Sequence, residues 1–252
     1  MGRVRLALVL LLEACTFRVH PETTRDAAID VATVDAVDAV DAPADAVDAR
    51  AIDAAPAFCD PSDATLIACY EFENTTTDAS GHSLDASSTG VTYVAGHRGQ
   101  AAHADGTTQM NVAENALLDP QAITIEAWIR APLPATGTRA GIIDNQNEWG
   151  FFLQPGGQLQ GVNLTSAAQV PASTWTHVAL TYDGTTCHYV NGVQVGATGG
   201  GGSPLSNAGV DGISIAADNP PGAGSPLDGD IDELRIYSVA RTAAQIAADA
   251  AL

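Results

Sequence analysis

The sequence predicts an all-β fold, an antiparallel β-sandwich of the jelly-roll type that carries one short C-terminal helix. From Phe58 onward, short apolar runs alternate with Gly, Asn, Asp and Pro, which is the pattern of strands joined by turns. Asp-Gly in "YDGTT" and Asn-Gly in "VNGV" lie between such runs, and both dipeptides favour tight hairpins. Many short strands with a single helical segment are typical of sandwiches and jelly rolls.

Six runs have the length and composition of strands, and they follow one another along the chain. They are "LIACYEFE" at 66–73, "ITIEAWIR" at 123–130, "WGFFLQ" at 149–154, "WTHVALTY" at 175–182, "TCHYVNG" at 186–192 and "DELRIY" at 232–237. The Gly-rich stretch at 196–207 is expected to be a flexible loop. "TAAQIAADAA" at 242–251 is expected to be a helix, because Thr242 can cap it and Gln245 follows three residues later.

Alternation within a strand predicts which side chains share a face. In "TIEAWIR", Ile125, Ala127 and Ile129 share one face, and they alternate with Glu126, Trp128 and Arg130. In "THVALTY", the residues at 178, 180 and 182 share the apolar face. These two runs therefore predict strands with one face toward a core.

The three tryptophans receive different interpretations. For Trp128 and Trp175, the family resemblance given below implies packing in the core rather than a role as platforms for sugars. Trp149 follows the polar stretch "DNQNE". Its ring is therefore placed either at the rim of the sandwich or in contact with a ligand.

The first 57 residues differ from the rest of the chain. Residues 1–15 combine two Arg, an apolar run from Leu6 to Leu12 and Cys15, which is the layout of a signal peptide too short to span a bilayer. "LEAC" is similar to a bacterial lipobox, in which Cys15 would be lipidated, and plain secretion is the alternative. We therefore expect an exported protein, either an outer-membrane or cell-surface lipoprotein or a secreted one, whose only link to a membrane is the lipid.

Residues 16–57 repeat Asp-Ala at short intervals and contain few large apolar residues. Such a segment cannot bury enough surface to fold, so we expect a disordered acidic linker, with a cation-binding repeat as the alternative. The folded domain is then expected at 58–252.

Charge and motif content exclude several classes of function. The formal net charge is −20 and all ten basic residues are Arg, so the chain lacks the basic surface that a nucleic-acid partner needs. An acidic surface favours neutral ligands or cations. The six His show no zinc-like spacing, and neither a nucleophile elbow nor a phosphate loop is present in the sequence.

Export makes disulfide bonds expected. With Cys15 set aside for the lipid, Cys59 and Cys69 flank a short loop that runs into a strand, and we expect them to be bridged. Cys187 would then be a free, buried thiol. Pairing of Cys69 with Cys187 is the alternative.

Five pieces of sequence, in order, resemble the laminin-G-like, concanavalin-A-like jelly rolls of bacterial surface proteins. They are "LIACYEFE", "DASGHSLDA", "ITIEAWIR", "WTHVALTYDGTTCHYVNGVQV" and "LDGDIDELRIYSVARTAAQI". The resemblance covers about 66–248. It implies a jelly roll and, in many relatives, one structural calcium ion.

The resemblance also implies where that calcium ion would bind. Asp78 of the "DASG" loop and Asp232 of "IDE" would provide carboxylates, and backbone oxygens near Gly81 and His82 would complete the shell. The alternative is that Asp78 makes a turn with its own backbone and that Asp232 accepts backbone N–H groups.

The acidic stretch "DGDIDELRIY" at 228–237 can be interpreted from strand alternation. Asp232 would share a face with Leu234 and Ile236 and point inward, where a carboxylate needs a cation, an Arg or several N–H donors. Glu233 and Arg235 would form a solvated ion pair on the other face.

Catalysis is the less favoured interpretation of this stretch. Asp228, Asp230 and Asp232 alternate as acids do in sugar hydrolases, but no Glu shares their face and the first two flank Gly229. We therefore expect a non-enzymatic surface module that binds a glycan or a protein or acts as a spacer. A polysaccharide hydrolase or lyase is the alternative, because the fold does not decide between them.

Overall fold

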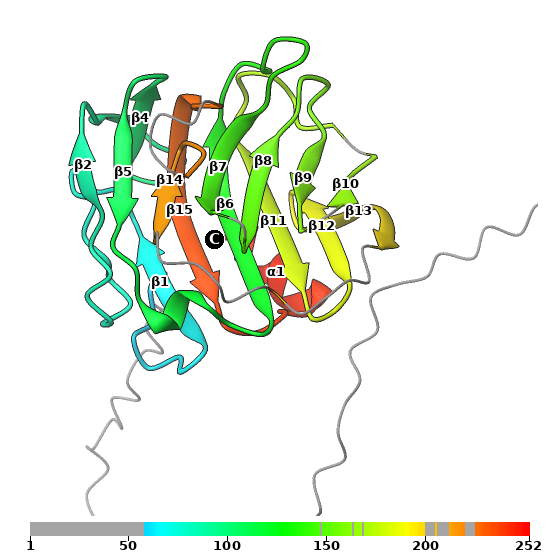
Figure 1. Cartoon of the computed structure of the whole chain (residues 1–252), viewed down its shortest axis with the longest axis horizontal. Coiled ribbons are helices and arrows are strands. Elements are labelled where there is room, and N and C mark those ends of the chain that lie inside the picture. The colour runs from blue at the N-terminus through cyan, green and yellow to red at the C-terminus, as the bar shows by residue number, and fades with distance from the viewer. Residues whose placement is uncertain are drawn as a thin grey trace, which may run out of the picture. The chain divides into compact units, whose positions relative to one another are not determined.

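The computed structural model describes residues 58–146, 148–162, 164–167, 169–199, 205, 212–219 and 225–252. The predicted signal segment 1–15, the linker 16–57 and most of the predicted loop 196–207 lie outside these residues. In the described part of the chain, two antiparallel sheets pack face to face and one short helix follows them (Figure 1). The predicted fold class is confirmed.

The larger sheet has eight strands within the described residues, in the order β13-β12-β11-β6-β15-β4-β3, and β1 also pairs with β15. Their bounds are β1 (Leu66–Tyr70), β3 (Thr92–Ala95), β4 (Gln100–Asp105), β6 (Ile123–Arg130), β11 (Thr176–Tyr182), β12 (Thr186–Val190), β13 (Val193–Gly199) and β15 (Asp228–Tyr237). Central strands β6 and β15 pair with each other, so residues of these two strands lie side by side at the middle of the sheet.

The smaller sheet has seven strands by the same description, in the order β10-β9-β8-β7-β14-β5-β2, and Figure 1 looks onto it. The bounds are β2 (Ser87–Thr89), β5 (Gln109–Val112), β7 (Ala140–Asn145), β8 (Trp149–Leu153), β9 (Leu159–Gly161), β10 (Leu164–Thr165) and β14 (Ile213–Ile215). A 3₁₀ turn, η1 (Ala116–Leu118), precedes β6.

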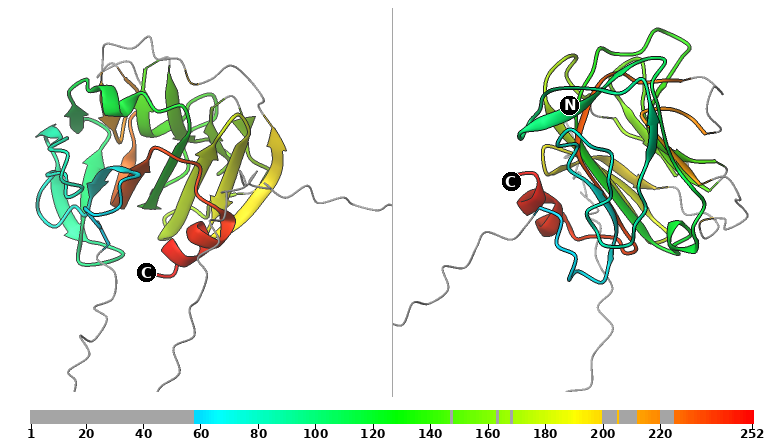
Figure 2. Two further views of the ribbon diagram at one scale, coloured as in Figure 1. Left: turned by 90° about the horizontal axis from the view of Figure 1, so that it is seen from below. Right: turned by 90° about the vertical axis from the view of Figure 1, so that its left-hand side faces the viewer.

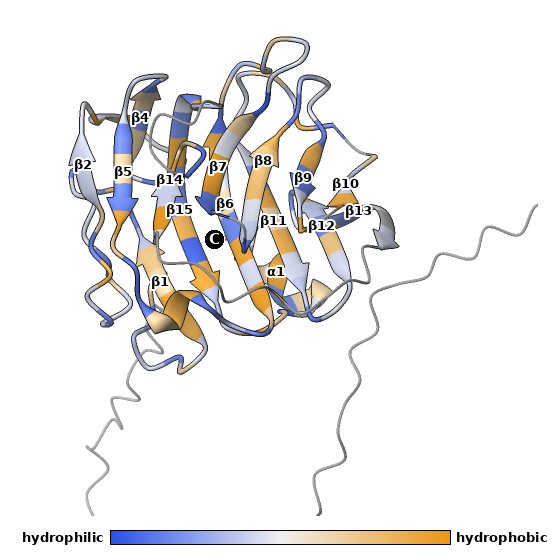
Figure 3. Cartoon of the chain, viewed as in Figure 1, coloured by the Kyte–Doolittle hydropathy of each residue, from blue (hydrophilic) through white to orange (hydrophobic). Residues whose placement is uncertain are grey.

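The core between the sheets is built from the faces that alternation predicted. Ile125 and Ile129 of β6 and Val178 and Leu180 of β11 lie in one buried cluster. Cross-strand pairing places Leu180 opposite Ile125. Figure 3 shows the resulting apolar stripes on the central strands.

The hairpin between β12 and β13 turns at Asn191 and Gly192, whose φ angles are +48° and +75°. Positive φ at both central residues is the geometry that an Asn-Gly turn favours. Gly192 has a second role, because a Cβ there would lie 2.9 Å from the Cα of Ala247 in the terminal helix. The turn therefore lets that helix approach the sheet closely.

Helix α1 (Ala243–Asp249) begins where the sequence predicted. The hydroxyl of Thr242 accepts the backbone N–H of Gln245 at 3.3 Å, and the Gln245 side chain accepts the N–H of Thr242 at 2.9 Å. Ile246 is buried against Ala179 and Tyr189. The helix thus covers part of the outer face of the larger sheet, the face turned away from the core (Figure 2).

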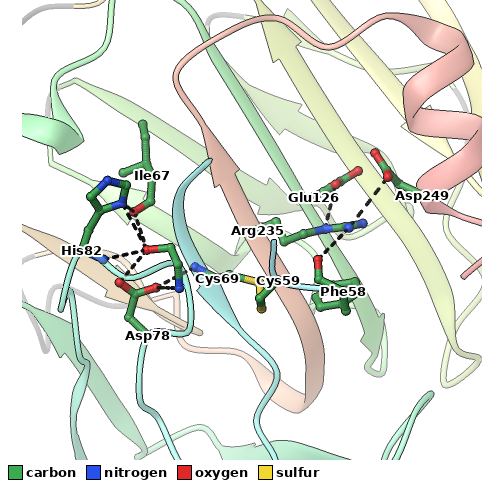
Figure 4. The surroundings of a disulfide bond; sticks show 10 residues. Phe58, Cys59, Ile67, Cys69, Asp78, His82, Glu126, Arg235 and Asp249 are labelled. Atoms are coloured by element: carbon green, nitrogen blue, oxygen red, sulfur yellow. Dashed lines mark hydrogen bonds and ion pairs between the residues drawn. A yellow bond between two sulfur atoms is a disulfide. The ribbon is translucent and has the colours of Figure 1, made fainter. Parts of the chain in front are cut away.

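A buried ion-pair network lies beside the helix on that outer face (Figure 4). The Arg235 guanidinium pairs with Glu126 at 2.9 Å and lies 3.7 Å from the carboxylate of Asp249, and it covers the ring of Phe58. The predicted solvated pair between Arg235 and Glu233 is therefore wrong. Both residues are buried, and Arg235 instead links the sheet to the helix.

The disulfide between Cys59 and Cys69 is confirmed, with their Cα atoms 5.8 Å apart. The prediction that Cys187 is free is wrong, because its sulfur is disulfide-bonded. The expectation of a spare thiol followed only from setting Cys15 aside for a lipid, and Cys15 lies outside the described residues.

Within the described residues, we find no helix with the length and apolar character needed to cross a bilayer.

His188 is a histidine in the core whose titration should govern stability in acid. Its ring stacks on Phe151 with centroids 6.1 Å apart, and neither ring nitrogen has a hydrogen-bond partner in the described part of the chain. Burial lowers the pKa of His188 to about 4. The unfolded chain takes up a proton near pH 6.5, so stability should fall from there toward pH 4, by on the order of 3 kcal/mol.

We predict that His188→Leu removes this acid sensitivity and leaves the protein at least as stable near neutral pH, because two unpartnered polar atoms are lost. Urea unfolding at neutral pH and near the pKa of about 4 measures both effects. His82→Gln, at an exposed histidine, is the matched control. An acid response of His188→Leu equal to that of the wild type would contradict the prediction.

Candidate functional site

The acidic stretch 228–237 forms the long strand β15, and a β-bulge interrupts its register. Pairing with β6 shifts between Asp232 and Arg235, and Glu233 adopts a φ of +54°. Ile231 before the bulge and Leu234 after it both lie in the core. The bulge therefore adds one residue between two inward-facing positions.

This extra residue moves Asp232 to the outer face. Its Cα pairs with that of Trp128, whose side chain also lies outside the core cluster. The prediction that Asp232 points inward beside Leu234 is wrong, because simple alternation does not hold across a bulge.

Asp232 is fully buried although it lies on the outer face. Its Oδ2 accepts the backbone N–H of Arg98 at 3.1 Å, whereas its Oδ1 has no partner in the described residues. Burial raises the pKa of Asp232 to about 6, against the lowering effect of nearby backbone N–H groups. A Cβ on Gly96 would lie 2.5 Å from Oδ2, so glycine is needed for the close approach of this loop.

Glu233 is the second buried carboxylate at the bulge. Its Oε2 is buried without a partner among the described residues. Burial and then the charge of Asp232 raise the pKa of Glu233 to about 8. An unpaired buried carboxylate is costly and two adjacent ones repel each other, so these groups need either a bound proton or a nearby cation.

Two further carboxylates act on these groups from the segment after β1. Glu73 raises the pKa of Asp232, and Glu71 raises that of Glu233. Glu73 also accepts the N–H of Gln100 at 3.1 Å, which ties it to the loop that contacts Asp232. We call Glu71, Glu73, Asp232 and Glu233 the acidic cluster. Among the described residues, no group of three or more His, Cys, Asp or Glu side chains lies close enough together to hold a metal ion.

The other predicted metal ligands do not fit a cation shell. Oδ1 of Asp78 accepts the N–H groups of Cys69 and Ser80, both at 2.9 Å, and Oδ2 accepts the Ser80 hydroxyl and the N–H of Leu84. Each oxygen already has two donors, so Asp78 acts as the centre of a local turn (Figure 4).

Gly81 and His82 are exposed, and the His82 ring contacts the carbonyl of Ile67 at 3.0 Å. Asp78 and Asp232 share no hydrogen-bond partner in the part of the chain that the structure describes. Of the two expected carboxylate ligands, Asp232 alone has an oxygen that lacks a donor among the described residues.

Asp230 is bound by two partners on its own face of the sheet. Its Oδ2 accepts Nε of Arg130 at 2.7 Å, and its Oδ1 lies 2.8 Å from Nδ1 of His103. Asp228, at the start of β15, is exposed. The alternating acids of this strand therefore lie in three different environments: exposed, ion-paired and buried.

Aromatic rings adjoin these acids on the outer face, where the sequence did not predict them. Trp128 and Trp175 are half-buried and lie outside the core, so their expected core packing is wrong. The exposed ring of His97 stacks on Trp128 with centroids 3.4 Å apart, and the ring of Trp175 lies edge-on to it at 6.4 Å. Burial lowers the pKa of His97, so its ring is neutral at pH 7.

Trp149 has the opposite environment from the one predicted. The ring is only 3% exposed, it belongs to the core, and its Nε1 donates to the carbonyl of Leu118 at 2.9 Å. The exposure on which a ligand contact would depend is therefore absent. The start of β8 turns the side chain inward rather than leaving it on the preceding turn.

A family model described as the concanavalin A-like lectin/glucanases superfamily matches residues 104–247, more than half of the chain. A search of curated proteins found no match.

Three similar solved structures illustrate the fold. The first is domain 4 of AbnA, a GH43 extracellular arabinanase from Geobacillus stearothermophilus, in complex with arabinotriose. Its sequence is 22% identical and its TM-score is 0.60, and the match covers 74% of this chain and 98% of that chain. The binding domain of Paraclostridial Mosquitocidal Protein 1 is 16% identical with a TM-score of 0.57, over 73% and 51%. A mutant Trypanosoma rangeli sialidase is 14% identical with a TM-score of 0.55, over 73% and 32%. Binding domains and enzymes thus share this fold.

Proposed function

This chain belongs to the concanavalin A-like lectin/glucanases superfamily, and we propose that it is an exported, non-enzymatic module that binds a glycan. Similarity to a domain in complex with arabinotriose supports a glycan as the partner. The net charge of −20 favours a neutral ligand over a polyanion.

The two ion-pair partners of Asp230 support the proposal that the module is not an enzyme. Glycosidases use two carboxyl groups, one acting as an acid and one as a base or nucleophile. Arg130 and His103 occupy both oxygens of Asp230, while Asp228 is exposed at the strand end. The similar sialidase does not weaken this conclusion, because the chain spans only 32% of it.

We further propose that one calcium ion binds at the acidic cluster, with Asp232 and Glu233 as ligands. Oδ1 of Asp232 and Oε2 of Glu233 are buried acceptors without partners in the described residues. Calcium takes six to eight oxygen ligands, including backbone carbonyls and waters. When bound, the ion would neutralise carboxylates whose pKa values burial has raised.

The calcium proposal predicts a thermal shift. Added calcium should raise the melting temperature and chelator should lower it, because a ligand at a hundredfold excess over Kd stabilises the fold by about 2.7 kcal/mol. Asp232→Asn and Glu233→Gln should each remove most of the shift. Asp78→Asn should lower the melting temperature yet keep the calcium-induced shift. Asp228→Asn should change neither the melting temperature nor the calcium-induced shift. Loss of the shift in Asp78→Asn alone would restore the ligand set first inferred from the sequence.

The glycan proposal predicts binding without turnover. On an array of neutral and acidic glycans, the full chain should bind neutral ones, and prolonged incubation with the bound glycan should release no reducing sugar. Product formation that Asp230→Asn abolishes would identify a hydrolase or lyase instead.

Export leads to a prediction about Cys15. We propose that the mature protein begins at Cys15 with a lipid on its sulfur, which would anchor the module to a membrane. With Cys59 bound to Cys69, a disulfide at Cys187 within this chain would need the sulfur of Cys15, and one sulfur cannot carry both a lipid and a disulfide. Lipidation therefore competes with the disulfide-bonded state of Cys187. Mass spectrometry of unreduced peptides should find the lipidated Cys15 peptide. A peptide linking Cys15 to Cys187, or cleavage at another residue, would contradict lipidation.

A further inference from the structure

Three aromatic rings lie together on the open part of the larger sheet's outer face, away from helix α1. We call His97, Trp128 and Trp175 the aromatic patch. They come from three separate segments: the loop before β4, strand β6 and the approach to β11. Both tryptophans are half-buried and His97, whose ring stacks on Trp128, is exposed, so part of each of the three residues is open to solvent. Packing between the sheets does not require these rings, because the buried core contains none of them.

A set of hydrogen-bonding side chains lies beside the patch. We call His103, Asp230 and Arg130 the polar triad. The Asp230 carboxylate is 10% exposed and binds both neighbours, whose side chains are 37% and 35% exposed. A guanidinium has five N–H groups; Arg130 donates one through Nε to Asp230 and one to the carbonyl of Ala95 at 3.4 Å. Nδ1 of His103 donates to Asp230, which leaves Nε2 of the neutral ring as an acceptor. The carboxylate therefore holds two partly exposed polar groups in fixed orientations, which lowers the entropy that a ligand must overcome.

The patch and the triad adjoin each other through Arg130. Its Cζ lies 4.8 Å from the ring centroid of Trp175. On strand β6 itself, Trp128 lies two residues before Arg130 and on the same face. Flat rings and oriented polar groups therefore lie next to one another across β4, β15 and β6.

We propose that the aromatic patch and the polar triad together bind a neutral oligosaccharide. Aromatic rings can stack on the apolar face of a sugar ring, Arg130 can donate to its hydroxyls, and Nε2 of His103 can accept from them. Asp230 neutralises the guanidinium, so the surface offers hydrogen bonds without a strong attraction for anions. This inference rests on the proposed glycan binding and adds its location and ligand class.

The opposite sheet provides a matched control. There Arg139 covers the ring of Phe152 at 3.7 Å and pairs with Asp218 at 3.2 Å. The same combination of arginine, aromatic ring and aspartate thus occurs on the other face of the sandwich. A substitution of Arg139 therefore tests whether loss of any arginine that covers an aromatic ring and pairs with an aspartate weakens sugar binding.

The experiment is calorimetric titration of the full chain with neutral trisaccharides, namely arabinotriose, xylotriose, cellotriose and mannotriose, and with a sialylated trisaccharide. Trp175→Ala and Arg130→Gln should each weaken the best neutral ligand by at least about tenfold, as tryptophan and arginine at the centre of a binding surface usually do. Trp175→Phe should retain most of the affinity, and Arg139→Gln should bind like the wild type. Melting temperatures of the variants show that they are folded.

Three results would overturn the inference. Wild-type affinity in both Trp175→Ala and Arg130→Gln would leave glycan binding intact but place it elsewhere. Loss of binding in Arg139→Gln alone would place it on the smaller sheet. Preference for the sialylated probe would contradict the neutral class. If the full chain bound neither these probes nor any glycan on an array, the proposed function would fall together with the site.

Discussion

One extra residue in the central strand β15 determines which groups reach which face of the larger sheet. β15 pairs with β1, β4 and β6, so its register is fixed from both sides. Ile231 and Leu234 both face the core, although two residues lie between them instead of the single residue of a regular strand. The bulge at Asp232 and Glu233 accommodates this spacing, at the cost of a positive φ at Glu233 and of two buried carboxylates.

The bulge also divides the outer face of that sheet into two regions. After it, Arg235 pairs with Glu126 beneath α1 and the segment around Phe58, and both side chains are buried. Before it, Asp230 meets Arg130 in a region that remains partly open to solvent. The ion pair of Arg235 and Glu126 in the covered region links the sheet to its surroundings, whereas the ion pair of Arg130 and Asp230 in the open region can contact a ligand.

The sequence predicted what depends on local patterns. Alternation gave the core faces of β6 and β11, Asn-Gly gave the β12–β13 turn, and Thr242 with Gln245 gave the helix start. The Cys59–Cys69 bridge followed from the short loop between them. Each of these features is determined by residues close together in the chain.

The site depended on contacts that local patterns do not contain. The bulge results from pairing with three strands, so alternation assigned Asp232 to the wrong face. Trp128 was assigned to the core by resemblance, although its own alternation with Ile125 and Ile129 already placed it on the opposite face. Asp78 carried the expected loop motif, but only the structure shows that four donors occupy its oxygens.

A crystal structure of the full chain, grown with calcium and soaked with the best neutral trisaccharide, shows whether the open outer face of the larger sheet is the binding surface. We expect sugar density against Trp175 and Arg130, and a calcium ion beside Asp232 and Glu233. Sugar bound on the smaller sheet near Phe152, with the aromatic patch free, would contradict this expectation.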